Sequence, residues 1–310
     1  MSSLSNIAAA RTYDAPAGGG ELLFDVRLAD HTSWRVGGNA DRLYWPAGSE
    51  DLVRFLQRLP EDEPLFWLGL GSNLLVRDGG IRGTVICTRG RLKDMSRVAE
   101  DRVFVEAGVP CAHVARFCVD RGYAGAEFLA GIPGTMGGAL AMNAGAFGGE
   151  TWSLVDHVIT VDRTGMVRKR RKSEYAIGYR SVAGAEGEWF LAAELKLQSG
   201  NGDAGRDKIR ELLAGRAAAQ PTNQPSCGSV FRNPEGDFAA RLIESCGLKG
   251  YTIGDAQVSP KHANFIVNLG NARASDIEAM IYHVQQQVAL RHGITLLPEV
   301  RIVGVAVEEV

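Results

Sequence analysis

The 310-residue sequence predicts an α+β protein with a separate domain at its C-terminus. Short apolar segments of strand length and amphipathic segments of helical spacing occur along the chain. Two glycine-rich stretches, residues 69–73 and 131–149, interrupt them, and a polar, glycine-rich segment at 199–205 marks a domain boundary. The length suffices for one large domain or for two to three smaller ones.

Composition and charge point away from several classes of protein. The net charge of −2 gives no indication of binding to nucleic acid or to an anionic membrane. No run of 18 apolar residues is present, and the N-terminus lacks the pattern of a signal peptide. Five cysteines without a CxxC motif are typical of reduced thiols, so we expect a cytoplasmic protein.

The N-terminal elements follow from local signals. Residues 1–20 are small and polar enough to form a loosely ordered tail. A turn at 31–38 leads into a strand at 42–45. Ser49 is predicted as the N-cap of a helix with apolar residues at helical spacing, and prolines end it before a strand at 65–68.

The glycine-rich loop at 69–73 comes directly after that strand. Gly69 and Gly71 permit a tight turn, Ser72 supplies a hydroxyl, and the exposed amides beside Asn73 suit a pyrophosphate. The loop is neither a Walker A motif nor a GxGxxG motif. Taken alone it fits a hairpin turn equally well.

Residues 131–149 contain seven glycines among mostly small or apolar neighbours. Such a run needs a backbone with positive φ or one that lets a ligand approach its amides. Apolar side chains such as Ile132, Met136 and Phe147 favour a buried loop over a flexible linker. The two glycine-rich stretches together indicate a large dinucleotide held mainly by backbone groups.

The remaining elements are predicted from periodicity and capping signals. In the middle of the chain these are strands at 84–87, 103–106 and 189–197, a helix at 110–121, and a hairpin of 154–161 with 166–172. The basic residues 168–172 are interpreted as a charged edge strand. Beyond the boundary we expect helices at 207–219, 237–246 and 275–291, a proline-containing loop at 220–226 and a strand at 264–268.

Three residues have side chains suited to chemistry. Ser229 lies in a glycine-flanked loop, Glu299 precedes an apolar strand segment, and Arg180 follows a Tyr-Ala-Ile-Gly-Tyr sequence. Ser229 is not in a Gly-x-Ser-x-Gly elbow. Each residue alone also fits a structural role, Ser229 in a turn and the other two at the surface.

The motifs taken together resemble the MurB family of UDP-N-acetylenolpyruvoylglucosamine reductases. The resemblance covers about residues 28–303 and rests on six motifs in family order: Gly69-Leu-Gly-Ser-Asn-Leu-Leu, Gly131-Ile-Pro-Gly-Thr-Met-Gly-Gly, Asn143-Ala-Gly-Ala, Tyr179-Arg180, Gly228-Ser229-Val-Phe-Arg-Asn-Pro and Pro298-Glu299-Val-Arg. The combination in this order is specific, although no single motif is.

The resemblance implies a flavin-binding fold of the vanillyl-alcohol-oxidase (PCMH) type. It implies two flavin-binding subdomains at 21–98 and 99–202, after the tail at 1–20, and a substrate domain at 203–310. It also implies non-covalent FAD, NADPH as the reductant, and UDP-N-acetylglucosamine enolpyruvate as the substrate. The reaction would belong to peptidoglycan precursor synthesis, and no obligate protein partner is expected.

The same resemblance implies roles for the three reactive residues. Ser229 would donate a proton, and Arg180 and Glu299 would stabilise the intermediate. Hydride addition to the enolpyruvyl double bond leaves a carbanion beside a carboxylate, which a guanidinium can neutralise and a protonated carboxyl can support by hydrogen bonding. This carbanion is basic enough to take a proton from an alcohol.

Cofactor and substrate contacts are likewise implied by the resemblance. The residues expected to bind FAD are Gly69, Gly71, Ser72, Asn73, Leu74, Gly131, Gly134, Thr135, Gly137, Gly138, Asn143 and Gly145. The residues expected to bind the substrate are Tyr179, Asn233, Lys261 and His262, with Lys261 directed at the UDP diphosphate. We expect no metal, because no second ligand lies at metal-binding spacing from His262.

Two further interpretations stay open on the sequence. Only 48 residues lie between Arg180 and Ser229, so the chain resembles the shorter class of the family, which lacks a tyrosine loop that covers the substrate. An FAD-dependent oxidase of the same fold is one alternative function, although no histidine lies in either glycine-rich stretch. A non-catalytic flavin- or nucleotide-binding module is another, and it would need neither Arg180 nor Ser229.

Overall fold

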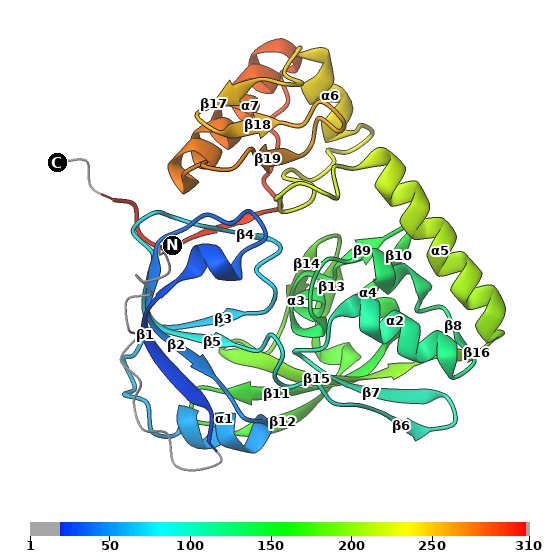
Figure 1. Ribbon diagram of the computed structural model, residues 1–310. Helices are drawn as coiled ribbons and strands as arrows, with labels where there is room; N and C mark the ends of the chain where they lie inside the picture. The colour runs from blue at the N-terminus through cyan, green and yellow to red at the C-terminus, as the bar shows by residue number, and fades with distance from the viewer. Residues whose placement is uncertain (1–18, 308–310) are drawn as a thin grey trace, which may run out of the picture.

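The computed structural model describes residues 19–307, which form three packed units (Figure 1). An opening lies between these units. The tail predicted at 1–20 lies outside the described residues except for Gly19 and Gly20. No helix of the described chain is long and apolar enough to cross a bilayer.

The first unit is a four-stranded sheet of order β1-β2-β5-β3, with β1 antiparallel to β2 and the other strands parallel. Its elements are β1 (Glu21–Arg27), η1 (Leu28–His31), β2 (Asn39–Trp45), α1 (Ser49–Leu56), β3 (Leu65–Leu68), β4 (Leu74–Val76) and β5 (Ile81–Cys87). The predicted strands at 42–45, 65–68 and 84–87 are confirmed. Leu52 and Leu56 of α1 pack on Tyr44 and Ile86 of the sheet, which fixes the helix against it.

Two local predictions in this unit are wrong or incomplete. Strand β1 was not predicted, because it is an edge strand without a fully buried position. Ser49 is not the N-cap, since Gly48 takes that place and the Ser49 hydroxyl instead donates to Glu106 Oε1 at 2.9 Å. A tertiary partner has replaced the local capping bond.

The second unit is a five-stranded antiparallel sheet of order β12-β11-β15-β7-β6. Its strands are β6 (Met95–Ala99), β7 (Arg102–Glu106), β11 (Val155–Asp162), β12 (Val167–Arg171) and β15 (Glu188–Lys196). The predicted hairpin and strands are confirmed, and β6 is an addition. The basic segment does form an edge strand, where Arg168 and Arg170 pair with Glu188.

The second unit also holds the helices and hairpins that border the opening. They are α2 (Cys111–Asp120), β8 (Tyr123–Ala124), η2 (Glu127–Gly131), α3 (Met136–Met142), β9 (Gly145–Ala146), β10 (Gly149–Glu150), α4 (Thr151–Leu154), η3 (Lys172–Glu174), β13 (Ala176–Gly178), β14 (Ser181–Ala183) and β16 (Gln198–Ser199). Trp152, Leu129 and Val114 are buried in the shared core with the sheet. The glycine-rich run therefore contains a short helix, α3, and is not only a loop.

The polar segment at 199–205 caps a helix. Helix α5 (Gly202–Ala219) begins earlier than predicted, because Asn201 Oδ1 accepts from the N–H groups of Asp203 and Ala204 at 2.9 and 3.1 Å. Gly205 lets α5 approach Val119 of α2 so closely that a Cβ there would lie 2.8 Å from a methyl carbon. Helix α5 therefore packs on the second unit and runs up to the third (Figure 1).

The C-terminal unit consists of a small antiparallel sheet of order β17-β18-β19 covered by two helices. Its elements are α6 (Ala239–Ser245), β17 (Thr252–Ile253), β18 (Ala256–Val258), β19 (Ile266–Asn268), α7 (Ala274–His292) and β20 (Arg301–Val303). The helices predicted at 237–246 and 275–291 and the strand at 264–268 are confirmed. Gly293, with φ +67°, ends α7 as expected.

The C-terminal unit is joined tightly to the first. Trp34 is fully buried in the core of the C-terminal unit, and its Nε1 donates to Ile266 O at 2.7 Å. Strand β20 returns to pair in parallel with β4, in register Arg301 with Leu74. These two connections fix the segment around Glu299 beside the loop at 69–73.

Candidate active site

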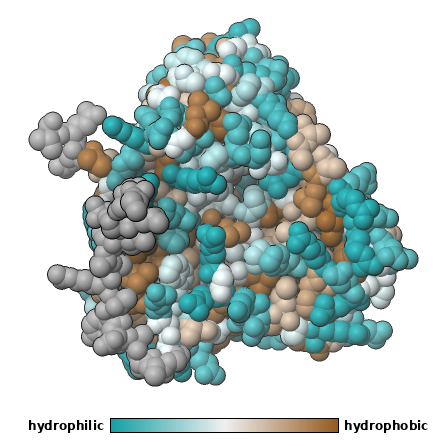
Figure 2. Space-filling model, in the orientation of Figure 1, coloured by the Kyte–Doolittle hydropathy of each residue, from teal (hydrophilic) through white to brown (hydrophobic). Residues whose placement is uncertain are grey.

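The opening between the three units is a cavity of about 720 Å³. Its walls come from the loop at 69–74, the run at 131–147, the hairpin β13–β14, the loop at 227–233 and Glu299. Outside the cavity, the face seen in Figure 2 is largely hydrophilic, with smaller hydrophobic areas. Segments that are far apart in the sequence therefore meet at one site.

The loop at 69–73 has the backbone that its glycines predict. Gly71 has φ +61°, and its carbonyl accepts from Ser33 N at 3.1 Å, which holds the turn. Within residues 19–307, the N–H groups of Ser72 and Asn73 have no protein acceptor. They are available to an anionic ligand in the cavity.

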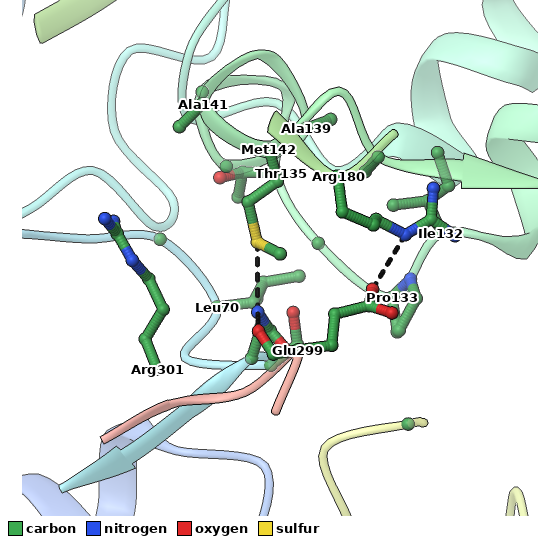
Figure 3. Close-up of a pocket in the computed structure, with 18 of the residues that line it drawn as sticks. Leu70, Ile132, Pro133, Thr135, Ala139, Ala141, Met142, Arg180, Glu299 and Arg301 are labelled. Carbon is green, nitrogen blue, oxygen red and sulfur yellow. Dashed lines mark hydrogen bonds and ion pairs between the residues drawn. The ribbon is translucent and has the colours of Figure 1, made fainter. Parts of the chain in front are cut away.

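Asn73 lines the cavity, but its side-chain amide is engaged by other residues of the protein. Its Nδ2 donates to Glu299 O at 2.9 Å and lies 3.0 Å from Met142 Sδ (Figure 3). Asn73 therefore joins the first glycine-rich loop to the Glu299 segment and to α3.

The glycines of the run at 131–149 serve close packing more than positive φ. Of these seven glycines only Gly148 has a positive φ. A Cβ at Gly137 would lie 3.0 Å from Ala107 Cβ, and Gly137 N donates to Ala107 O at 2.8 Å. Across the cavity wall, a Cβ at Gly69 would lie 2.4 Å from Thr135 Oγ1. Gly137 and Gly69, both predicted to bind FAD, are thus needed for the close packing of the cavity walls.

Part of the predicted backbone cradle remains open to a ligand. In the described chain the N–H groups of Gly134 and Thr135 have no acceptor, whereas those of Met136 and Gly137 bond to Val109 and Ala107 carbonyls. A Cβ at Gly138 would meet nothing within 4 Å, and Gly138 lines the cavity. Free amides beside an open glycine fit a nucleotide cofactor with a diphosphate.

Gly138→Ala separates a cofactor role from a packing role. The added methyl group projects into free space, so we expect the flavin-free protein to be more stable by up to about 1 kcal/mol. Overpacking against a bound cofactor, at about 1–3 kcal/mol, lowers FAD affinity about tenfold. Thermal unfolding and FAD titration measure the two effects.

Gly215→Ala is the matched control, because Gly215 also lies in a helix with nothing within 4 Å but does not line the cavity. It should gain stability without losing FAD affinity. Equal FAD affinities of the two variants would contradict the proposal that Gly138 lies against bound FAD.

The side chain of Asn143, which was predicted to bind FAD, is held by other residues of the protein. Its side chain is 1% exposed, and Asn143 does not line the cavity. Nδ2 donates to Glu150 Oε2 and Gly178 O, and Oδ1 accepts from Trp152 N. All its polar atoms are engaged by protein, so Asn143 fixes the end of α3 to the two neighbouring hairpins.

Arg180 lies at the turn of the hairpin β13–β14 with φ +53°, a region unusual for a non-glycine residue. Its Nε donates to Glu299 Oε1 at 2.8 Å (Figure 3). Nη2 donates to Gly145 O at 3.1 Å. The two side chains are 17% and 15% exposed. Arg232 Nη2 in turn donates to Arg180 O at 3.3 Å. The guanidinium is therefore fixed from several sides.

Ser229 and Glu299 are brought together by backbone pairing. Glu299 N donates to Val230 O at 2.7 Å, and Phe231 forms a bridge with Pro298. Asn264 holds the same loop, since its side chain bonds both the N–H and the carbonyl of Phe231. In the described part of the chain the Ser229 hydroxyl has no hydrogen-bond partner, and Ser229 lines the cavity.

Cys227 is a packed thiol beside this loop. It is buried, and burial, followed by the charge of Glu299, raises its pKa well above the usual range. The thiol therefore stays protonated and is a poor nucleophile.

The predicted substrate residues divide into two groups. Tyr179 and Asn233 line the cavity. Lys261 and His262 do not: Lys261 is exposed and its Nζ donates to Ala217 O at 2.6 Å, while the His262 ring packs against Phe265. The Ser259 hydroxyl accepts from the N–H groups of both residues and so fixes the local backbone.

Arg216, which was not predicted, lies on the cavity wall instead. It is near the end of α5, and its Nε donates to Gln220 Oε1 at 3.0 Å. No carboxylate of the described residues pairs with it, and burial lowers its pKa. In the sequence it is one of many cations on an ordinary helix, and only the packing of α5 reveals its place.

No cluster of three or more His, Cys, Asp or Glu side chains suited to a metal ion occurs among the residues described. The absence of a metal stays a prediction.

The chain is similar to known proteins over most of its length. A family model described as UDP-N-acetylenolpyruvoylglucosamine reductase, C-terminal domain, matches residues 220–303, and one described as FAD binding domain matches residues 40–169. A UDP-N-acetylenolpyruvoylglucosamine reductase from Methylococcus capsulatus is 65% identical over 299 residues, which cover 96% of this chain and 98% of that protein. Another from Alkalilimnicola ehrlichii is 61% identical, with 93% and 96% covered.

A solved structure agrees as well. The crystal structure of UDP-N-acetylenolpyruvylglucosamine reductase (MurB) from Thermus caldophilus has a TM-score of 0.76 and 33% identity, covering 91% of this chain and 98% of that chain. With the FAD-binding match, this confirms the predicted α+β fold of the vanillyl-alcohol-oxidase type.

Proposed function

This chain belongs to the family of UDP-N-acetylenolpyruvoylglucosamine reductases, and on that premise we propose that it uses NADPH and bound FAD to reduce UDP-N-acetylglucosamine enolpyruvate to UDP-N-acetylmuramate. The observation that carries the proposal is the Arg180–Glu299 pair, which lies with Ser229 on one cavity whose other wall is a cradle of glycines and free amides. An oxidase or a simple binding module has no use for this trio.

The residues of the two glycine-rich stretches fit FAD. The N–H groups of Ser72, Asn73, Gly134 and Thr135 would hold its diphosphate, and Gly138 leaves room for it. When bound, FAD supplies hydride transfer between the nicotinamide and the enolpyruvyl group.

The paired side chains stabilise charge on the substrate. Hydride addition to the enolpyruvyl double bond leaves negative charge on the carbon next to a carboxylate. The Arg180 guanidinium, fixed by Glu299 and Gly145, is positioned to neutralise it without reorganisation. Glu299 accepts from Nε and the Gly145 carbonyl accepts from Nη2, so the guanidinium is held in place on the cavity wall.

The Ser229 hydroxyl then completes the reduction by donating a proton to that carbon. It carries no bond to the protein in the described chain, so nothing must be broken before it acts. Positioned proton transfer of this kind is typically worth about 10²–10⁴-fold in rate.

Arg216 takes the place that Lys261 was predicted to have. A half-buried guanidinium on the cavity wall without a carboxylate partner suits the diphosphate of the UDP group. We expect Arg216→Met to raise the KM for the UDP-sugar about tenfold or more, as the loss of a charged hydrogen bond of about 1.5–3 kcal/mol implies. Steady-state kinetics at saturating NADPH measure the change.

Lys261→Met is the matched control, because Lys261 lies outside the cavity. Its KM should stay within about twofold of the unsubstituted value. A raised KM for Lys261→Met together with an unchanged KM for Arg216→Met would instead support Lys261 and His262 as the residues that bind the diphosphate.

Several finer features belong to the same proposal. The chain works in the cytoplasm, which its five unpaired thiols favour, and supplies a peptidoglycan precursor for cell-wall growth, cell shape and division. It acts without an obligate protein partner. It belongs to the shorter class of the family, since β14 and β15 are joined by a short turn at 184–187.

The test is a coupled assay with matched substrates. NADPH oxidation should require the enolpyruvyl sugar and should not occur with UDP-N-acetylglucosamine, which lacks the double bond. The product should gain two mass units over the substrate. NADPH oxidation at the same rate with both sugars would contradict the proposed function. So would the absence of NADPH oxidation with either sugar.

A further inference from the structure

A strained aromatic residue lies at the rim of the cavity. Phe147 and Gly148 form the two-residue turn between β9 and β10, in register Gly149 with Ala146. Both turn residues have positive φ, +52° and +83°, which is the pattern of a type I′ turn. The first position of such a turn favours Asn or Gly, and a bulky aromatic there is an outlier.

The Phe147 ring packs against the backbone at Gly131. A Cβ at Gly131 would lie 2.3 Å from Phe147 Cε2, so only glycine at 131 allows the ring to rest on that backbone. The ring is nonetheless 44% exposed, and Phe147 lines the cavity. A side chain present only for packing would be buried and would not need a disfavoured backbone. Strain that is retained at a ligand cavity is an indication of function.

The hairpin that carries the ring also contacts Arg180. Gly145, at the start of the same hairpin, accepts a hydrogen bond from Arg180 Nη2 at 3.1 Å. Phe147 is thus two residues along the chain from Gly145, which contacts the Arg180 side chain. Gly131, on which the ring rests, is among the residues expected to bind FAD.

We propose that Phe147 is a substrate-contact residue whose exposed ring supports the glucosamine ring of the substrate. This inference rests on the proposed function. The enolpyruvyl group is joined directly to the sugar, so the sugar must lie next to Arg180 and Ser229 when the double bond does. The C–H groups of a sugar face are weakly positive and suit the negative face of an aromatic ring.

Phe147→Asn tests the inference, because Asn fits the turn better but removes the ring. We expect the KM for the UDP-sugar to rise about tenfold, equivalent to the loss of one aromatic contact. The rate of flavin reduction at saturating NADPH should stay unchanged. The Tm should not fall and should rise by about 2 °C if the backbone strain is relieved. Phe147→Tyr, which keeps the ring, should keep the KM.

The outcomes separate three explanations. An unchanged KM with a lower Tm would assign Phe147 to packing and overturn the inference. Slower flavin reduction by NADPH would assign it to the flavin side and overturn it as well. The proposed function is judged separately, on the unsubstituted chain: if that chain reduces the enolpyruvyl sugar, a failure of Phe147→Asn to change the KM counts only against the sugar contact.

Discussion

Ser229→Ala is expected to lower turnover about 10²–10⁴-fold while NADPH still reduces the bound flavin at the normal rate. The hydroxyl is the only group removed, and it is needed after hydride addition rather than before. In the structure it lies unbonded on the cavity wall, in a loop that backbone pairing fixes beside Glu299. Stopped-flow spectroscopy measures the reduction of flavin by NADPH and the reduction of the enolpyruvyl sugar separately.

Ser72→Ala is a useful control for this variant. Ser72 also carries a hydroxyl on the cavity wall, but it belongs to the glycine-rich loop that holds the cofactor. We expect its effect to fall on FAD affinity, with turnover at saturating FAD largely kept. Equal losses of turnover in both variants would remove the special role of Ser229.

Arg180→Lys is expected to lower kcat about 10²–10³-fold, as the loss of a preorganised donor at developing charge does. Lysine keeps the positive charge but cannot reproduce the fork that bonds Glu299 with Nε and Gly145 with Nη2. The protein should stay folded because the charge of Glu299 keeps a counter-charge. Flavin content and kcat, measured on the same preparation, check both statements.

Two further variants sharpen the result. Glu299→Gln keeps the size of the side chain but not its charge, so it tests whether the pair, and not the guanidinium alone, is required. Arg210→Lys makes the same chemical change on an exposed face of α5, where Arg210 pairs with Asp207. A kcat of Arg180→Lys as high as that of Arg210→Lys would contradict the charge-stabilising role.

The sequence was sufficient wherever local signals and packing agree. Helix α7 has both apolar spacing and a terminal glycine, and the hairpin β11–β12 has two periodic strands around a Thr-Gly turn, so both were predicted closely. The trio Arg180, Ser229 and Glu299 was found through motifs, not through spacing, because 119 positions separate the paired side chains. Their convergence depends on β20 and the β13–β14 hairpin.

Tertiary contacts explain what the sequence could not reveal. Ser49 looks like an N-cap, but its hydroxyl donates a hydrogen bond to Glu106 of β7 instead. Asn143 looks like a cofactor ligand, but its amide is used up by two hairpins and a helix. Lys261 and Arg216 are equivalent as cations in the sequence, and only the packing of α5 on the second unit places Arg216 on the cavity.

The most direct measurement is an anaerobic absorbance titration of the purified chain. We expect an oxidised-flavin spectrum that bleaches with NADPH and returns on addition of UDP-N-acetylglucosamine enolpyruvate. A flavin that bleaches but returns only with oxygen would favour an oxidase. A chain that binds no flavin even with added FAD would contradict the account of both glycine-rich stretches.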